Sequence, residues 1–298
     1  MLTNDEERLP VLPVLALILA MGLWSSSFIA LKIAFRAYDP MVVIFGRMLI
    51  ASLCFFIVAK RVVRSIHYQK GDYKLILFMT FCEPCLYFIF EAKAMVNTTA
   101  SQAGVITATL PIMTMFAAAF FLKEKISPKA SLGAAIALAA TVWLTLESSP
   151  SEEAPHPILG NILEGMAMVC ATGYTITLKV LTKRYSPFFL TAVQALAGCF
   201  FYFPLLFLPS TNLPQEFELL PFLAVLYLGS FITLGAYGLY NYGIKYIPAN
   251  RGTIFVYLIP IFSVILGYLI LDESFTLQQV FAGLLILTGV YISQKQRK

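Results

Sequence analysis

Residues 29–40, IALKIAFRAYDP, recur in modified form at residues 176–187 as ITLKVLTKRYSP. The two segments lie 147 positions apart and are identical at five places. Similar segments at a fixed spacing are typical of an internal duplication. We therefore interpret the chain as two related halves, residues 1–150 and residues 151–298.

Each half also carries a proline inside an apolar run. Pro111 and Ile112 recur as Pro260 and Ile261, at a spacing of 149. Proline removes a backbone hydrogen bond from a helix, so we expect a bend and a free carbonyl near Pro111 and near Pro260. Duplicated halves whose apolar segments are interrupted at matching places are typical of secondary transporters, and the interruptions point to the binding site.

The composition is that of a membrane protein. Of the 298 residues, 59% are hydrophobic and 12% are charged, and the mean hydropathy is +0.80. In a soluble domain about a quarter of the residues are charged. The sequence predicts an all-α integral membrane protein with ten transmembrane helices, each an apolar run of about 20 residues. These runs lie near residues 11–33, 41–60, 74–96, 99–122, 128–147, 158–180, 187–208, 219–243, 251–271 and 276–294.

Basic residues predict the orientation of the chain. With the N-terminus in the cytoplasm, 17 of the 21 lysines and arginines lie inside, and only Lys32, Arg36 and Lys93 lie outside. Cytoplasmic loops carry the excess of basic residues in membrane proteins. We therefore expect a multi-pass protein of the cytoplasmic membrane with both termini in the cytoplasm.

Loop charges indicate that the repeat is inverted. Five crossings in each half make the second half enter the membrane from the opposite side. Residues 123–125, KEK, are then inside, whereas the matching residues 272–274, DES, are outside. This change of charge is what an inverted duplication requires. The sequence thus predicts two inverted five-helix repeats.

Several segments resemble a known family. They are LWSSSFIALKIA at 23–34, DPMVVIFGRMLIASL at 39–53, the apolar region 100–144 and its counterpart at 250–292. Together they resemble the EamA-type members of the drug/metabolite transporter (DMT) superfamily. The resemblance implies ten helices in two inverted repeats around a central substrate cavity that opens alternately to either side. The serine triplet 25–27 departs from the family, which more often has glycine or asparagine there.

Four charged residues fall inside the predicted spans, where a charge costs about 2.5–3.5 kcal/mol. They are Arg47, Glu83, Glu91 and Glu164. Glu83, Tyr87 and Glu91 recur every four residues and form one polar stripe along a helix. We predict that Glu83 lies in the transport pathway and carries a proton. Arg47, which can pair with Glu91 or Glu164, is expected in a charge cluster nearer the outside. The alternative is that these charges neutralise one another and hold helices together.

Aromatic residues deep in the spans predict a chamber for substrate. Aromatic faces beside carboxylates suit an organic cation or a zwitterion. The alternative is that these side chains pack helices together or lie at the membrane interface. The residues predicted to contact substrate are Trp24, Glu83, Tyr87, Tyr174, Tyr237, Asn241 and Tyr257.

Other motifs argue against other classes of protein. The five cysteines lie inside the spans and predict no disulfide framework. His67 and His156 are expected in loops on opposite sides of the membrane, so we predict no metal site and no membrane-embedded enzyme. A GxxxxGK[ST] motif is absent from the sequence, so direct ATP coupling is not expected. No cofactor and no nucleic-acid partner are predicted.

The predicted function is secondary-active transport of a small organic metabolite, such as an amino acid or a related amphipathic compound. Export is favoured over import by the family resemblance alone, and coupling to a proton gradient or to exchange is the default. Two alternatives stay open. An exchanger of anionic phosphorylated metabolites would need paired basic residues deep in the helices, where only Arg47 is found. A role as a non-transporting membrane scaffold would not explain why glutamates lie inside the membrane spans.

Overall fold

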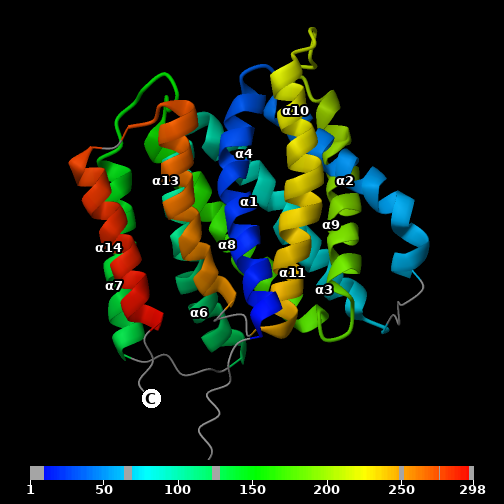
Figure 1. The fold of residues 1–298 in the computed structure, drawn as a ribbon, viewed down its shortest axis with the longest axis horizontal. Helices are drawn as coiled ribbons and strands as arrows, with labels where there is room; N and C mark the ends of the chain where they lie inside the picture. Colours follow the sequence, from blue (N-terminus) through cyan, green and yellow to red (C-terminus); the bar gives the residue numbers. More distant parts are fainter. Residues whose placement is uncertain (1–9, 64–68, 123–127, 248–251, 275, 295–298) are drawn as a thin grey trace, which may run out of the picture.

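Helices form all the regular structure in the described part of the chain, apart from one isolated bridge between Ser151 and Ala154. The structure is a computed structural model in which the helices stand side by side in one bundle (Figure 1). The chain enters α1 and leaves α14 at the same end of this bundle (Figure 1). The structure describes residues 10–63, 69–122, 128–247, 252–274 and 276–294.

Helix positions agree with the predicted apolar runs. Five helical stretches are long and apolar enough to cross a membrane, namely Val11–Phe35, Asp72–Asn97, Ala100–Phe121, Pro187–Phe207 and Leu219–Tyr246. The individual elements are α1 (Val11–Phe35), α2 (Pro40–Val63), α3 (Asp72–Thr80), η1 (Phe81–Leu86), α4 (Tyr87–Asn97), α5 (Ala100–Ile106), η2 (Thr107–Thr109), α6 (Leu110–Leu122), α7 (Pro128–Leu146), α8 (Pro157–Leu181), α9 (Pro187–Tyr202), η3 (Pro204–Phe207), α10 (Leu219–Tyr227), η4 (Leu228–Ala236), α11 (Tyr237–Tyr246), η5 (Thr253–Tyr257), α13 (Leu258–Leu271) and α14 (Leu277–Gln294).

Two of the predicted spans are broken by π-helical segments. η1 separates α3 from α4, and η4 separates α10 from α11. Within η1, Glu83 has extended backbone angles (φ −149°, ψ 114°) and Pro84 follows it. Because proline cannot donate a backbone hydrogen bond, Pro84 accounts for the first break. Bends were predicted from the sequence only at Pro111 and Pro260, and neither π-helical break was predicted.

Short 3₁₀ segments precede Pro111 and Pro260. η2 leads into α6, of which Pro111 is the second residue, and η5 leads into α13, of which Pro260 is the third. Pro111 has no N–H to offer the carbonyl of Thr107, which accepts the N–H of Leu110 instead. The prediction of a free carbonyl is therefore wrong at Thr107, because the carbonyl is hydrogen-bonded within the 3₁₀ segment.

The long helix α1 lies in the middle of the bundle, against α10, α11 and α13 (Figure 1). α7 and α14 pack together at one edge, and α2 packs against α9 towards the other. The main hydrophobic core surrounds α1, and a smaller cluster lies between α7 and α14. Helices distant in sequence thus meet around α1, where the cavity described below lies.

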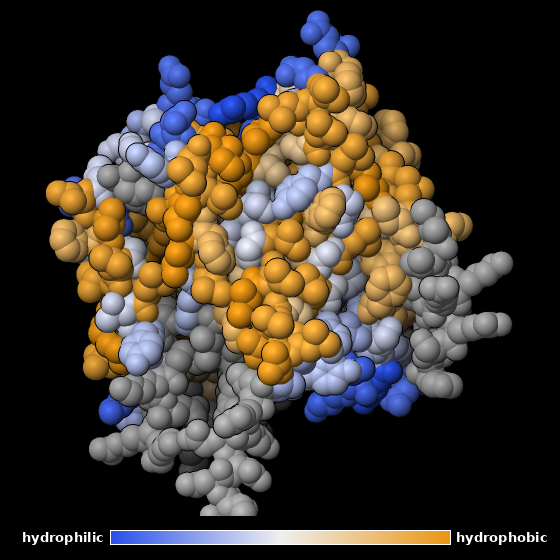
Figure 2. Space-filling view, in the orientation of Figure 1, coloured by the Kyte–Doolittle hydropathy of each residue, from blue (hydrophilic) through white to orange (hydrophobic). Residues whose placement is uncertain are grey.

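An apolar band covers the middle of the visible face, and hydrophilic residues collect at its two ends (Figure 2). Large apolar side chains are exposed on the bundle as a whole, among them Phe120, Phe200 and Phe56. A surface of this kind suits a membrane and would make a soluble protein aggregate. Several residues used to predict orientation lie outside the described residues, namely Arg8, Arg64, residues 123–125, Arg251 and residues 295–298, as does His67.

Candidate functional site

A cavity of about 40 Å³ lies where the broken helices meet α1 and α8. A volume of this size holds a few water molecules. A larger solute can enter only if helices move. The cavity is lined by Trp24, Ser27, Phe28, Arg47, Glu83, Tyr87, Phe88, Glu91, Thr107, Leu110, Met168, Ala171, Tyr174, Thr175, Tyr237, Tyr240, Val256 and Ile259.

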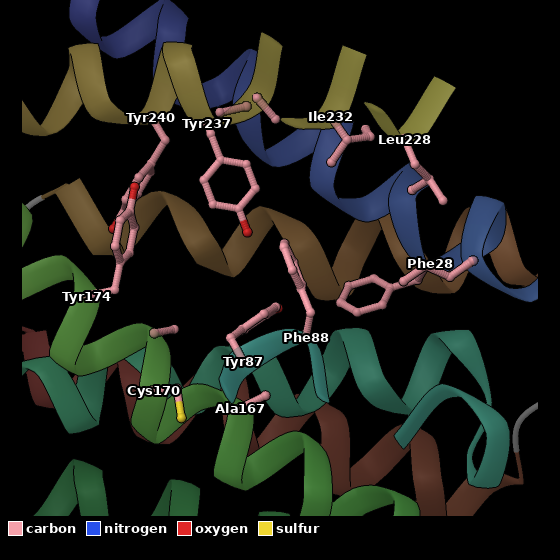
Figure 3. Packing of buried hydrophobic residues seen from close by; sticks show 14 of the residues in the cluster. Phe28, Tyr87, Phe88, Ala167, Cys170, Tyr174, Leu228, Ile232, Tyr237 and Tyr240 are labelled. Carbon is pink, nitrogen blue, oxygen red and sulfur yellow. The ribbon is translucent and has the colours of Figure 1, made fainter. Parts of the chain in front are cut away.

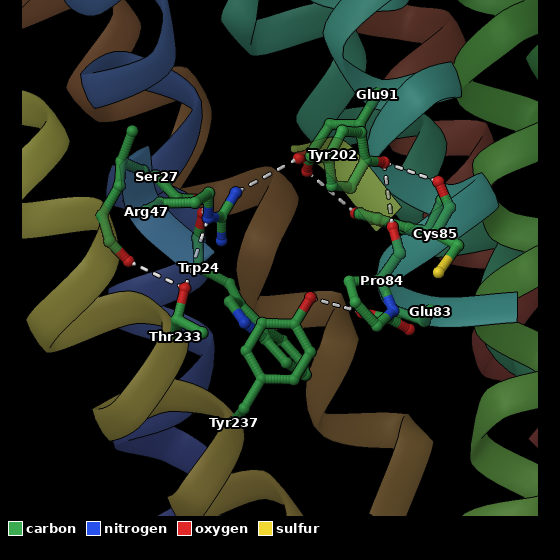
Figure 4. A network of polar contacts seen from close by, with 12 residues as sticks. Trp24, Ser27, Arg47, Glu83, Pro84, Cys85, Glu91, Tyr202, Thr233 and Tyr237 are labelled. Atoms are coloured by element: carbon green, nitrogen blue, oxygen red, sulfur yellow. Dashed lines mark hydrogen bonds and ion pairs between the residues drawn. The ribbon is translucent and has the colours of Figure 1, made fainter. Parts of the chain in front are cut away.

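Glu83 is a buried carboxylate at the cavity wall, placed there by the break in its helix (Figure 4). Its side chain accepts a hydrogen bond from the Tyr237 hydroxyl, and the residue is only 4% exposed. Among the described residues, no lysine, arginine or histidine forms an ion pair with it. A buried carboxylate without a cation is costly while it is charged. The site therefore favours a proton on Glu83 or a cationic group of a solute beside it.

Side chains of α9 hold the broken backbone in place. Gln194 Nε2 donates to the carbonyl oxygen of Glu83 at 3.3 Å. The Tyr202 hydroxyl donates to the carbonyl oxygens of Cys85, at 2.5 Å, and Pro84, at 3.2 Å. These donors satisfy carbonyls that the interrupted helix leaves free. The position of Glu83 thus depends on a helix from the other half of the chain.

Arg47 is the cationic side chain of the cavity wall, and it is 1% exposed. Its Nη1 lies 3.6 Å from Glu91 Oε2, and its Nε donates to Thr233 Oγ1 at 3.3 Å. The guanidinium carbon lies 4.2 Å from the centre of the Phe88 ring. Tyr87 donates to the second oxygen of Glu91 at 3.0 Å. The sequence allowed Arg47 to pair with Glu91 or with Glu164, and the structure pairs it with Glu91 (Figure 4).

Glu164 is fully buried on α8 and does not line the cavity. Neither of its side-chain oxygens has a hydrogen-bond partner among the described residues. Arg47 pairs with Glu91, and no ion pair to Glu164 is found among the described residues. Glu164 is therefore a second buried carboxylate without a cation, which is costly while it is charged.

Aromatic rings form the rest of the chamber (Figure 3). The ring centre of Trp24 lies 5.2 Å from that of Tyr237 and 4.8 Å from that of Tyr240. Tyr174 stacks on Tyr240 at 6.4 Å. The indole N–H of Trp24 has no hydrogen-bond partner among the described residues. It is therefore available to a solute in the cavity.

Two of the residues predicted to contact substrate do not line the cavity. Asn241 is fully buried, accepts a hydrogen bond from the Tyr174 hydroxyl and donates to Thr191 Oγ1 at 2.8 Å. It therefore positions Tyr174. Tyr257 is half-buried and packs against the core cluster between α7 and α14. Pro111 and Pro260 are also absent from the lining, although the cavity-lining residues Leu110 and Ile259 directly precede them.

Several residues that build the site were not identified from the sequence. Phe88 lies under Arg47, Thr233 accepts from it, and Gln194 and Tyr202 bind the broken backbone. Pro84 inside an apolar run was the available signal, since it predicts carbonyls in need of donors. The signal does not say which helix supplies the donors.

The comparisons with known proteins identify the family. Residues 11–146 and residues 158–294 each match the EamA-like transporter family. The chain belongs to this family. The predicted resemblance to the DMT superfamily is thereby confirmed.

Relatives of this EamA-like transporter come from bacteria, archaea and plants. An uncharacterized transporter of Archaeoglobus fulgidus is 26% identical over 285 residues, which cover 95% of this chain and 99% of that protein. The uncharacterized transporter YetK of Bacillus subtilis is 26% identical, over 77% of this chain and 70% of its own. The chloroplastic WAT1-related protein At3g02690 of Arabidopsis thaliana is 23% identical, over 90% of this chain and 66% of its own.

A solved crystal structure has the same fold. It superposes with a TM-score of 0.67 at 17% identity and covers 94% of this chain and 95% of its own. This EamA-like transporter is thus a multi-pass membrane protein built on an established fold, with a polar and aromatic cavity at its centre.

Proposed function

We propose that the protein is a secondary-active transporter, working as an exporter, of a small zwitterionic metabolite such as an amino acid. The observation that carries this proposal is the pair of opposite charges on the cavity wall. Glu83 forms no ion pair among the described residues, and Nη1 of Arg47, which lies 3.6 Å from Glu91, has no hydrogen-bond partner among them. An ammonium group can bind Glu83 and a carboxylate can bind Arg47. The aromatic rings cover the apolar part between them.

Alternating access through two inverted five-helix repeats is the proposed mechanism. The same family matches both halves, which supports the division at residue 150. The breaks η1 and η4 also fall at equivalent places in the two halves. All ten helical stretches would then cross the membrane, with the repeats rocking around the cavity.

Two equivalent tyrosines, each hydrogen-bonded to the other half of the chain, support the inverted repeat. Tyr38 and Tyr185 occupy equivalent places in the repeat. The Tyr38 hydroxyl donates to the carbonyl of Glu218, at the start of α10, and accepts its N–H, both at 3.1 Å. The Tyr185 hydroxyl donates to Asp72, at the start of α3, at 3.0 Å. Each half thus holds the third helix of the other half at opposite ends of the bundle.

Orientation is tested by labelling cysteines. In a variant without the five native cysteines, Glu152→Cys, in the exposed 147–157 loop, is expected to react with a membrane-impermeant maleimide in intact cells. Lys183→Cys, also exposed, is expected to react only after permeabilisation. This pattern places both termini in the cytoplasm. The reverse pattern would contradict the proposed orientation.

Glu83 is proposed to couple transport to protons. The proton and the substrate ammonium would compete for the same carboxylate, so binding of one requires release of the other. The phosphorylated-metabolite alternative is less well supported, because Arg47 is the only basic side chain among the described cavity-lining residues. A scaffold is less well supported because it has no need of unpaired buried carboxylates.

The deciding experiment is a set of matched ligands added to the purified protein. Thermal unfolding is measured with amino acids, with their decarboxylated amines and with their deaminated acids, since ligands that bind the folded state raise the melting temperature. We expect the largest shift from a zwitterion, a smaller one from the amine and none from the acid. Flux of the best ligand is then followed in proteoliposomes. Stabilisation by phosphorylated compounds alone would favour the exchanger, and a bound ligand without flux would favour the scaffold.

Trp24→Ala is expected to weaken binding of that ligand about 2- to 30-fold, since a cation–π contact contributes about 0.5–2 kcal/mol. Trp24→Phe keeps a ring and is expected to retain part of the affinity. Both are measured by ligand titration of the melting temperature. Phe200→Ala, at an exposed position on α9, serves as the control. Equal loss in the control and in Trp24→Ala would remove Trp24 from the site.

A further inference from the structure

Two helices from different halves lie between the cavity and the end of the bundle proposed to face outward. α5 runs towards the cavity and is followed by the lining residues Thr107 and Leu110. α13 begins near the lining residues Val256 and Ile259, and its far end meets the start of α5, because Glu273 bonds to Ala100 and Ser101. The two helices pack against each other. Their contact therefore lies between the cavity and that end of the bundle.

Small residues let these two helices approach closely. A methyl group added at Gly104 of α5 would lie 1.9 Å from the hydroxyl oxygen of Ser263 on α13. A methyl group added at Gly267 would lie 2.2 Å from the hydroxyl oxygen of Ser101. Ser101 also donates to the carbonyl of Ser263 at 3.4 Å. Contacts of this kind depend on close packing, so they are lost once the helices separate.

Glu273, just beyond α13, binds the start of α5. Its two carboxylate oxygens accept the backbone N–H groups of Ala100, at 2.8 Å, and Ser101, at 2.9 Å. These N–H groups open the helix and have no partner within it, and they carry the positive end of the helix dipole. Asp272 adopts a left-handed conformation (φ 54°), which turns the chain so that Glu273 faces α5. Glu273 is 8% exposed.

Other hydrogen bonds tie α5 to its opposite neighbours. Gln102 Oε1 accepts from Ser148 Oγ at 2.8 Å and from Asn161 Nδ2 at 3.0 Å. Thr98 Oγ1 donates to Asn161 Oδ1 at 2.6 Å. This buried network fixes α5 to α8 and to the end of α7. If the contact opens, α13 is the helix that leaves, and it must break the hydrogen bonds of the Glu273 carboxylate as well as the one between Ser101 and Ser263.

We propose that the contact between α5 and α13 is the outer gate of the cavity and that Glu273 is its latch. Glu273 is a positioning residue that keeps α13 against α5 while the cavity is closed to the outside. The proposal rests on the proposed alternating access. Opening breaks two hydrogen bonds to a charged acceptor, and closing restores them. The latch adds an energetic preference for the outward-closed state without contacting the substrate.

Cavity access from the outside tests the latch. In the variant without native cysteines, Ser27→Cys places a thiol in the cavity wall. Its rate of reaction with a membrane-impermeant maleimide is measured in right-side-out vesicles. Adding Glu273→Gln is expected to raise this rate roughly 2- to 30-fold, the range that corresponds to losing an anion at a helix N-terminus. Asp272→Asn removes the same charge from the exposed neighbouring residue, and asparagine keeps the left-handed conformation that turns Glu273 towards α5, so the rate is expected to stay unchanged.

Each outcome decides the proposal. An unchanged rate in Glu273→Gln, or an equal rise in Asp272→Asn, overturns the latch. Glu273→Asp, which keeps the charge on a shorter side chain, is expected to restore part of the closure. If Glu273→Gln does not fold, Gly104→Val separates the same helices with Glu273 intact and must raise the rate, or the gate is elsewhere. The labelling needs no cargo, so it can support the gate even if every proposed substrate fails in flux assays.

Discussion

Glu83→Gln is expected to reduce transport of the zwitterionic substrate about 10- to 100-fold. The amide is nearly the same shape and can still accept the Tyr237 hydrogen bond, so the fold is expected to survive. What disappears is the negative charge that binds the substrate ammonium, and a hydrogen bond to a charged group is worth about 1.5–3 kcal/mol. Flux into proteoliposomes, measured with and without a pH gradient, checks this result. The response to the gradient is expected to vanish together with the flux.

Glu153→Gln is the matched control for that experiment. Glu153 is half-exposed and pairs with Arg36 at 3.5 Å on the surface, so the same chemical change is made away from the cavity. Its flux and pH response are expected to equal those of the unmodified protein, since exposed ion pairs contribute little. Full, pH-dependent flux in Glu83→Gln would remove Glu83 from the mechanism. Loss of flux in both variants would show that the assay responds to charge in general.

Arg47→Met is expected to lower the free energy of unfolding by about 3–5 kcal/mol, because it leaves the buried carboxylate of Glu91 without a cation. Arg47 is 1% exposed, and Glu91, at 3.6 Å, is the carboxylate that forms an ion pair with it. The measurement is thermal or denaturant unfolding of the purified protein in detergent. Arg36→Met, at a surface ion pair, is the control and is expected to change stability by less than about 0.5 kcal/mol.

A double variant separates the structural role of Arg47 from its role in binding. Arg47→Met with Glu91→Gln removes both charges of the pair and is expected to recover most of the lost stability. Binding of the zwitterion should stay weak, because the partner of its carboxylate is gone. Binding of the decarboxylated amine should be restored. Recovery of zwitterion binding in the double variant would confine Arg47 to the structural role.

Glu83 illustrates how much of the candidate site could be predicted from the sequence. Four-residue spacing placed Glu83, Tyr87 and Glu91 on one helical stripe, and all three line the cavity. The stripe nevertheless passes through a break, which helical periodicity does not reveal. The partner of Glu83 is Tyr237, and the donors to its backbone come from α9. These contacts join residues more than a hundred positions apart, and no local pattern in the sequence links them.

Asn241 shows the opposite case. Both it and Tyr237 were predicted to contact substrate, and the two residues lie four positions apart, on one face of a helix. In the fold, Tyr237 lines the cavity, whereas Asn241 bonds to Tyr174 and Thr191 behind it. Residues on one helical face can meet different neighbours, because each contact depends on which helix lies opposite at that depth.

The sequence by itself determined that the protein is helical and apolar, where its helices lie, and to which family it belongs, because these properties follow from local composition, periodicity and repeated motifs. Only the tertiary structure decided which charge is paired and which is not. Arg47 neutralises Glu91, Glu83 lacks a cation among the described residues, and Glu273 reaches across to α5. The physical reason is that a buried charge is stabilised or destabilised by atoms within a few ångströms of it, and those atoms come from helices that only folding brings together.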